Sequence, residues 1–170
     1  MQFGLFYEAS EDPRQTHAER YAEMLDLIVF GESLGFDVAW LAEIHFGGAF
    51  SLLSAPLMLV PAIASRTRRI RIGTAVTQVP LHHPLELAEQ VATADILSDG
   101  RFEFGVGRGS IPTQFHGFGV LLEENRARFG EALEVMRLAW TTERFSYQGH
   151  FYQVDNLAVA RFADEVMPKV

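Results

Sequence analysis

The sequence has no cysteine, no uninterrupted apolar run of about eighteen residues, and fewer basic than acidic side chains. The absence of cysteine excludes disulfide bonds and thiolate metal sites. Without a long apolar run or a basic-then-apolar start, the chain is predicted to be cytoplasmic, with no membrane partner. It has 14 Lys and Arg against 22 Asp and Glu, for a net charge of -8. That balance argues against a nucleic-acid partner, because phosphate binding needs clustered cations.

The chain has enough residues (170) and enough hydrophobic content (48%) to bury one core. We therefore expect a single domain over residues 1–170. The spacing of apolar residues alternates along the chain between that of strands and that of helices. Strands are predicted at residues 3–7, 37–42, 69–76 and 101–106. Helices are predicted at residues 16–35, 54–65, 84–97 and 123–140.

Capping residues and prolines set the expected ends of the helices. Thr16 is a candidate N-cap for the first helix, and Gly35 a candidate C-cap. Pro61 lies inside the second helix and is expected to kink it or to mark its first turn. Pro84 suits the first turn of the third helix.

The pattern changes after the fourth predicted helix. That helix carries an apolar stripe made of Phe129, Leu133, Met136 and Trp140. Residues 145–154 are then predicted to form a short β-hairpin with Gly149 in its turn.

Four consecutive strand-helix units with short connections predict an α/β fold with parallel strands and right-handed crossovers. Such strands either close into a barrel or stay open as a doubly wound sheet, and periodicity alone does not choose between the two. A complete eight-fold barrel needs about 250 residues, and at least about 200. The chain therefore supplies about half of such a barrel.

Five segments, in the same order and at similar spacing, resemble the first half of the bacterial luciferase-like flavin-dependent monooxygenases. They are MQFGLF at residues 1–6, GFDVAWLAEIHF at 35–46, IGTAV at 72–76, HP at 83–84 and DGRFEFGVGRG at 99–109. The resemblance covers essentially residues 1–157. It implies a TIM-type (β/α)8 barrel, here a half barrel, and reduced flavin mononucleotide (FMN) supplied by a separate flavin reductase. It also implies molecular oxygen and a small organic substrate such as an aldehyde, alkane or sulfonate. A related branch with the same barrel uses a deazaflavin instead.

The resemblance places Arg108 near the flavin phosphate, and the neighbouring Gly107 lets backbone approach a ligand closely. A guanidinium matches a phosphate with two parallel hydrogen bonds. Taken without the resemblance, Arg108 is equally an arginine that pairs with a carboxylate at a strand end. The glycines at 105, 107 and 109 do not have the spacing of a dinucleotide-binding fingerprint.

The resemblance also places Thr74, Ala75 and Val76 against the flavin ring, at an unusual backbone bend. Small side chains leave room for a flat ring. The alternative is that these residues fill the inside of a barrel, opposite larger side chains.

Glu43, Ile44 and His45 follow the second strand, where parallel α/β proteins build their sites. Family members often have two histidines here, the first of them acting in acid-base chemistry, whereas this chain has Ile44 at that position. His45 is therefore the catalytic candidate. Its alternative role is to tether the loop at residues 46–50. Glu43 is a candidate cofactor ligand, with a structural carboxylate bonded to backbone or to an arginine as its alternative.

No metal site is predicted. His82 and His83 precede a proline, and an extended pre-proline segment does not readily present two neighbouring rings to one ion. Even when His45 is taken together with these two histidines, no acidic residue lies at a spacing that suits a metal site.

The end of the sequence departs from the family pattern. Residues 161–168 resemble the last helix and tail of full-length members, which predicts an internal deletion around Leu157 to Arg161. A half barrel leaves two strand edges exposed, and exposed edges pair with other chains, so we expect a homo-oligomer. The alternatives to a monooxygenase are a non-catalytic flavin-binding or subunit protein and a fragment without a function of its own.

Overall fold

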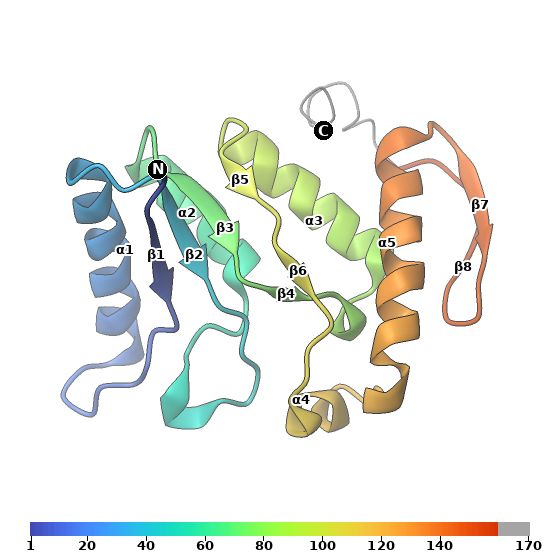
Figure 1. Ribbon diagram of the computed structural model, residues 1–170, viewed down its shortest axis with the longest axis horizontal. Coiled ribbons are helices and arrows are strands. Elements are labelled where there is room, and N and C mark those ends of the chain that lie inside the picture. Colours follow the sequence, from blue (N-terminus) through green and yellow to red (C-terminus); the bar gives the residue numbers. More distant parts are fainter. Residues whose placement is uncertain (160–170) are drawn as a thin grey trace. The chain divides into compact units, whose positions relative to one another are not determined.

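The computed structural model describes residues 1–159, which form two compact units (Figure 1). Unit 1 comprises Met1–Thr77 and Leu97–Val106. Unit 2 comprises Gln78–Ile96 and the described residues from Gly107 onward. The predicted C-terminal helix and tail at residues 161–168 lie outside the described residues.

Unit 1 contains a four-stranded sheet in the order β1-β2-β3-β5, and every neighbouring pair is parallel. Its strands are β1 (Gly4–Tyr7), β2 (Val38–Leu41), β3 (Arg71–Thr74) and β5 (Phe102–Glu103). The remaining strands are β4 (Thr77–Gln78), β6 (Val106–Gly107), β7 (Phe145–Gln148) and β8 (Gln153–Leu157). Parallel strands in sequential order confirm the predicted α/β half-barrel class.

The α-helices are α1 (His17–Ser33), α2 (Leu59–Arg66), α3 (Pro84–Leu97), α4 (Pro112–Gly117) and α5 (Asn125–Thr141). Short 3-10 turns are η1 (Gly48–Phe50), η2 (Pro56–Met58), η3 (Val79–Leu81) and η4 (Leu122–Glu124). Pro84 begins α3, as predicted, and Pro61 falls in the first turn of α2.

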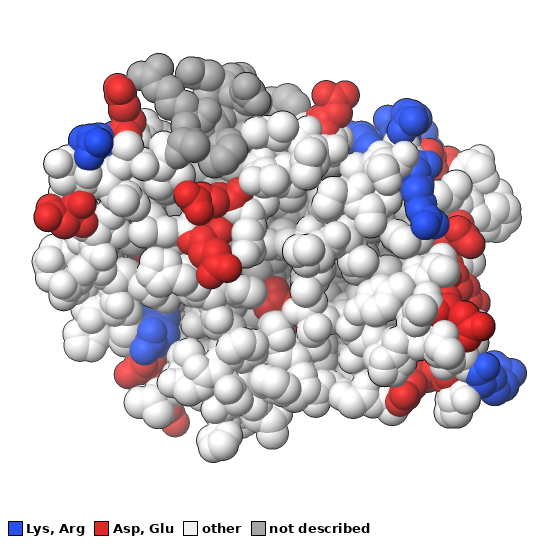
Figure 2. Space-filling model, turned by 180° about the vertical axis from the view of Figure 1, so that it is seen from behind, with Lys and Arg blue, Asp and Glu red and all other residues white. Residues whose placement is uncertain are grey.

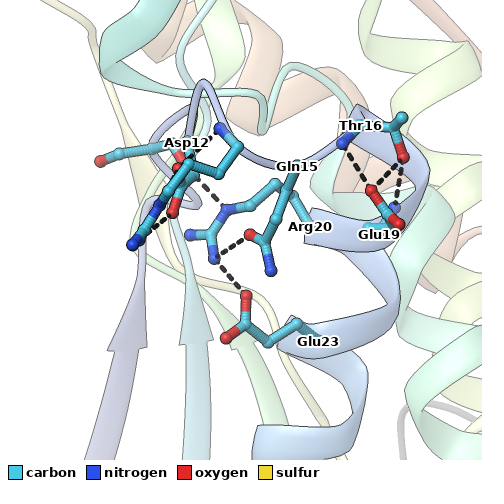
Figure 3. A network of polar contacts seen from close by, with 8 residues as sticks. Asp12, Gln15, Thr16, Glu19, Arg20 and Glu23 are labelled. Atoms are coloured by element: carbon cyan, nitrogen blue, oxygen red, sulfur yellow. Dashed lines mark hydrogen bonds and ion pairs between the residues drawn. The ribbon is translucent and has the colours of Figure 1, made fainter.

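The start of α1 is fixed by a capping box, which confirms Thr16 as its N-cap. The Thr16 hydroxyl accepts from the Glu19 backbone N–H at 3.2 Å, and the Glu19 carboxylate accepts from the Thr16 N–H at 2.7 Å (Figure 3). Hydrogen bonds from Thr16 lower the pKa of Glu19. Arg20 lies one residue further, where it donates to the Ser10 carbonyl at 3.0 Å and pairs with Glu23. These contacts hold the loop after β1 against α1.

Two strands are shorter than predicted, and the reason lies in contacts between strands. The predicted strand at residues 69–76 ends at Thr74, after which the Ala75–Val76 peptide bond is cis. The predicted strand at 101–106 divides into β5 and β6. The chain leaves the sheet where the Thr74 hydroxyl and the Thr77 N–H both donate to the Gly105 carbonyl, each at 2.8 Å.

Within unit 2, the face of α5 that is buried differs from the predicted one. The fully buried residues of α5 are Ala132, Val135, Met136 and Ala139. Phe129, Leu133 and Trp140 are only half buried. Of the four residues in the predicted apolar stripe, only Met136 is fully buried. Small alanines face the core of this unit, and the large residues lie along the borders of the stripe. The short helix α4 was not predicted.

The predicted hairpin is confirmed as β7 and β8, which are antiparallel. Glu131 of α5 anchors the turn between them by accepting from the backbone N–H groups of His150 at 3.0 Å and Phe151 at 2.9 Å. Burial raises the pKa of Glu131, but these N–H donors lower it by more, so the pKa lies below its ordinary value. The Glu131 charge therefore stabilises the fold of unit 2.

Replacing Glu131 by glutamine is expected to destabilise the protein by about 1 kcal/mol at neutral pH. Because the folded-state pKa is depressed, this stabilisation is present above the unfolded carboxyl pKa of about 4.3. It is lost as the pH falls through the folded-state value. Urea denaturation at about pH 7 and about pH 3 should therefore show the difference between wild type and Glu131→Gln shrinking in acid. A difference that is the same at both pH values would contradict a role for the charge.

Charged side chains are spread over the surface. On the face drawn in Figure 2, Lys and Arg occur in small separate groups with acidic side chains between them. Among residues 1–159, no helix is long and apolar enough to pass through a lipid bilayer.

Candidate functional site at the carboxyl edge of the sheet

The carboxyl ends of β1, β2 and β3 meet at one edge of the sheet in unit 1. The Ala42 N–H donates to the Tyr7 carbonyl at 3.0 Å, and the Ala75 N–H donates to the Leu41 carbonyl at 2.8 Å. These two bonds continue the strand pairing just beyond the ends of the strands. They bring residues 43–45 and 74–76, which are separate in the sequence, to the same edge.

Glu43 and His45 form a hydrogen-bonded pair at this edge, with Nε2 of His45 at 2.8 Å from Oε1 of Glu43. The Glu43 side chain is 1% exposed and that of His45 is 11% exposed. A buried carboxylate beside an imidazole holds the ring in one orientation. Glu43 thus has a histidine partner, where the sequence suggested a cofactor, backbone or an arginine.

Ile44 lies between these two residues and packs elsewhere. Its backbone N–H donates to the Leu53 carbonyl at 2.8 Å. A Cβ added at Gly47 would stand 2.9 Å from Cγ2 of Ile44, so the isoleucine side chain packs closely under the Gly47 loop. At this edge the chain therefore presents His45 bonded to Glu43, with Ile44 supporting the following loop.

The loop after His45 is tied to the loop after β1. The Ser51 hydroxyl donates to the Glu8 carbonyl at 2.5 Å, and the Tyr21 hydroxyl donates to the Leu52 carbonyl at 2.5 Å. Phe46 and Phe50 are exposed by 66% and 56%. The site is thus bordered by a braced loop that carries two exposed aromatic rings.

The segment from Thr74 to Thr77 forms the neighbouring part of the edge. The buried Thr74 hydroxyl donates its hydrogen bond to the Gly105 carbonyl. Val76, by contrast, is 39% exposed. Thr77 is fully buried, and its hydroxyl oxygen has no hydrogen-bond partner within residues 1–159. A buried polar atom without a partner is uncommon and suits a ligand or a bound water. The sequence alone did not single out Thr77.

Gly105 is a second residue that sequence reasoning did not single out. A Cβ built on it would stand 1.9 Å from the Thr74 carbonyl oxygen. Only glycine allows this approach of two backbones. Gly105 therefore fixes the position of the Thr74–Thr77 segment.

Gly107 and Arg108 belong to unit 2 and are described apart from the residues above. Arg108 is exposed, and within residues 1–159 its guanidinium makes no hydrogen bond or ion pair. The loop that carries it is held by Asn125, whose side-chain amide donates to the Gly109 carbonyl at 3.1 Å. Gly109 has a φ of +70°, a conformation that favours glycine. Arg108 is thus an available cation on a braced loop.

The chain matches the family described as luciferase-like monooxygenase over residues 1–168. The uncharacterized protein y4vJ of Sinorhizobium fredii is 33% identical over 161 residues, which are 94% of this chain and 46% of that protein. The alkanal monooxygenase alpha chain of the Kryptophanaron alfredi symbiont is 33% identical over 136 residues, 80% of this chain and 38% of its own length. The chain therefore spans less than half the length of these two relatives.

Solved structures agree with this assignment. Monooxygenase RslO1 from Streptomyces bottropensis superposes with a TM-score of 0.89 at 30% identity, over 96% of this chain and 50% of that one. The oxygenating constituent of 3,6-diketocamphane monooxygenase from Pseudomonas putida, solved in complex with FMN, has a TM-score of 0.87 at 21% identity, over 96% and 48%. The second likeness bears on the fold alone. The family match over almost the whole sequence and these neighbours, which are TIM barrels, show that the chain belongs to the luciferase-like monooxygenase family.

Proposed function

We propose that the chain binds a flavin at the carboxyl edge of its sheet and acts in a flavin-dependent monooxygenase that oxidises a small organic substrate. The observation that carries the proposal is the arrangement at this edge: the buried Glu43–His45 pair and the Thr74–Thr77 segment come to the same place. The partly exposed Val76 offers this segment an apolar surface for a flat ring.

Each candidate residue has a role in this proposal. Thr74, Ala75 and Val76 form the segment that lies against the flavin ring. Arg108 and the Gly107 backbone, taken within unit 2 alone, are the proposed ligands of a phosphate, since a guanidinium with no partner among residues 1–159 offers two parallel N–H donors. The bound flavin supplies the activation of oxygen.

His45 holds or moves a proton beside the ligand, and Glu43 keeps the His45 ring in one orientation through their 2.8 Å hydrogen bond. Glu43 is therefore a positioning residue in this scheme, beside its predicted role as a cofactor ligand. Phe46 and Phe50 offer an apolar border for an organic substrate.

Reduced FMN from a separate flavin reductase is the proposed cofactor, supported by the FMN found with the oxygenating constituent of 3,6-diketocamphane monooxygenase. A cytoplasmic location and the internal deletion around Leu157 to Arg161 remain predictions.

A second candidate is a protein that binds flavin without turnover. It is favoured by Ile44, which stands where family members often have their acid-base histidine and which packs against the loop at Gly47. Substrate-dependent oxygen consumption with reduced FMN separates the two candidates.

Titration of the purified chain with oxidised FMN, reduced FMN and a deazaflavin tests the proposal, followed by absorbance and fluorescence. Saturable binding of reduced FMN is expected. Arg108→Ala is expected to weaken it by about 10- to 100-fold, the value of a charge-assisted phosphate contact. Arg137→Ala, which removes another exposed arginine of unit 2, is the matched control and is expected to leave the affinity unchanged. A cooperatively folded chain that binds none of the three cofactors would refute the proposal.

A further inference from the structure

The loop that carries Arg108 is packed against three other elements of unit 2. Its backbone turns at Gly109, whose φ of +70° favours glycine. The Asn125 side-chain amide, at the start of α5, donates to the Gly109 carbonyl at 3.1 Å. A Cβ added at Gly109 would stand 2.5 Å from Oε1 of Gln78 and 3.0 Å from the Phe115 ring of α4. Gly109 therefore lies in close contact with side chains that come from β4, α4 and α5.

Gln78 and Gln114 form a buried amide pair next to this loop. Nε2 of Gln78 donates to Oε1 of Gln114 at 2.6 Å, and the two residues are 5% and 1% exposed. Because Gln78 donates with its amide nitrogen, the amide oxygen is the atom that lies near Gly109. Gln114 belongs to α4 and precedes Phe115. The amide pair thus connects β4 and α4 to the glycine that follows Arg108.

These contacts favour one conformation of the loop. A buried amide loses free energy when its hydrogen bond is broken, so a bonded pair specifies the arrangement of the elements that carry it. The helix α4 has only six residues, and so short a helix depends on its tertiary contacts. Asn125 begins α5, a helix of 17 residues that includes fully buried positions of unit 2. The backbone at Gly109 is therefore held in place through elements on either side of it in the sequence.

Arg108 itself is exposed, and its guanidinium has no partner among residues 1–159. A long side chain loses rotamer freedom when it binds a ligand, and a loop that also had to become ordered would add to that loss. When the backbone is held in advance, only the side chain has to be ordered. The contacts at Gly109 therefore affect a ligand of Arg108, although none of them involves the guanidinium.

We infer that Asn125 and the Gln78–Gln114 pair are positioning residues, which hold the Arg108 loop in the conformation that receives a phosphate group. The inference rests on the proposed function, in which Arg108 binds the phosphate of a flavin. The three side chains act through Arg108, because they contact the residue next to it and need not touch the ligand. A side chain that stabilised only the fold would affect a flavin with a phosphate and a flavin without one alike.

Titration of the full chain with reduced FMN and with reduced riboflavin, which lacks the phosphate, tests the inference. The quantity compared is the ratio of the two dissociation constants. Wild type is expected to prefer FMN by about 10- to 100-fold, the value of a charge-assisted contact. Asn125→Ala is expected to lower this preference by about 3- to 10-fold, the value of one hydrogen bond, and to leave riboflavin affinity unchanged. Gln114→Met, which removes the acceptor for Gln78 at similar volume, is expected to act in the same direction.

The effect of Asn125 is expected to require Arg108. Arg108→Ala should remove the preference for FMN, and Asn125→Ala added to it should change the ratio no further. Gln90→Ala is the matched control, because Gln90 is an exposed amide on α3 that donates to Glu86 at 3.0 Å. It is expected to leave both affinities unchanged. Urea denaturation of each variant reports whether it is folded under the conditions of the titration.

The outcomes separate the inference from the proposed function. Equal affinity of wild type for the two flavins would refute the phosphate contact of Arg108, and the inference with it. A preference for FMN that Arg108→Ala removes, but that both Asn125→Ala and Gln114→Met leave intact, would overturn the inference alone. An equal loss of FMN and riboflavin affinity in these two variants would also overturn it, since that is the effect of a role in the fold only.

Discussion

Gly105→Ala is expected to destabilise the protein by about 3 kcal/mol or more, because the new Cβ has no space. It would stand 1.9 Å from the Thr74 carbonyl oxygen, a backbone atom in the end of β3. If the obstructing atom belonged to a side chain, that side chain could rotate away. The Thr74 carbonyl is backbone, and it can move only if the strand ends separate. Separation would also break the two 2.8 Å hydrogen bonds that the Gly105 carbonyl accepts from Thr74 and Thr77.

Gly130→Ala is the matched control for this change. Gly130 lies inside α5, and a Cβ added there meets nothing within 4 Å. Alanine in an open helical position is expected to stabilise by about 0.5 to 1 kcal/mol. Urea denaturation of both variants should therefore move the midpoint in opposite directions. Equal, small effects of the two substitutions would show that the Thr74 and Gly105 backbones do not approach as closely as described.

The consequence of Gly105→Ala reaches the candidate site as well. Gly105 holds the segment that carries Val76, against which the flavin ring is proposed to bind. A variant that still folds is expected to bind reduced FMN more weakly than wild type, whereas Gly130→Ala is not. The two readouts connect the stability of the strand ends to the proposed function.

Local signals in the sequence predicted most of the elements of unit 1. The Thr16 N-cap, the proline that begins α3, and the strands around Phe6 and Trp40 all follow from spacing and capping within a few residues of chain. The ends of β3 and β5 do not follow from such local signals. The alternating pattern continues to Val76, and the strand stops at Thr74 because of contacts with Gly105, 31 residues away.

In the candidate site, too, some contacts follow from sequence spacing and others do not. Glu43 and His45 are two residues apart, and alternate side chains of an extended segment point to the same side. Their pairing could therefore have been predicted from the sequence. The hydrogen bond from Asn125 to Gly109, which braces the Arg108 loop, joins residues in different elements. No spacing rule predicts it. The resemblance to a family predicted which residues matter, and packing determined what holds them.

Glu43 and His45 are expected to couple by about 2 kcal/mol or more in a double-mutant cycle of unfolding free energies. Their side chains are 1% and 11% exposed, so neither group is well compensated by water when its partner is removed. Glu43→Ala, His45→Ala and the double variant, measured by urea denaturation at neutral pH, give the coupling. The cycle subtracts the other contacts that each side chain makes.

A second histidine–glutamate pair in the same chain provides the control. Nε2 of His17 lies 3.3 Å from Oε1 of Glu11, but these side chains are 64% and 40% exposed. Water screens them, so their coupling is expected to stay below about 0.5 kcal/mol. Equal coupling in the two cycles would contradict a special role for the buried pair. If Glu43→Ala also lowers turnover more than Glu11→Ala at equal flavin occupancy, Glu43 acts on the reaction through the orientation of His45, beyond its effect on stability.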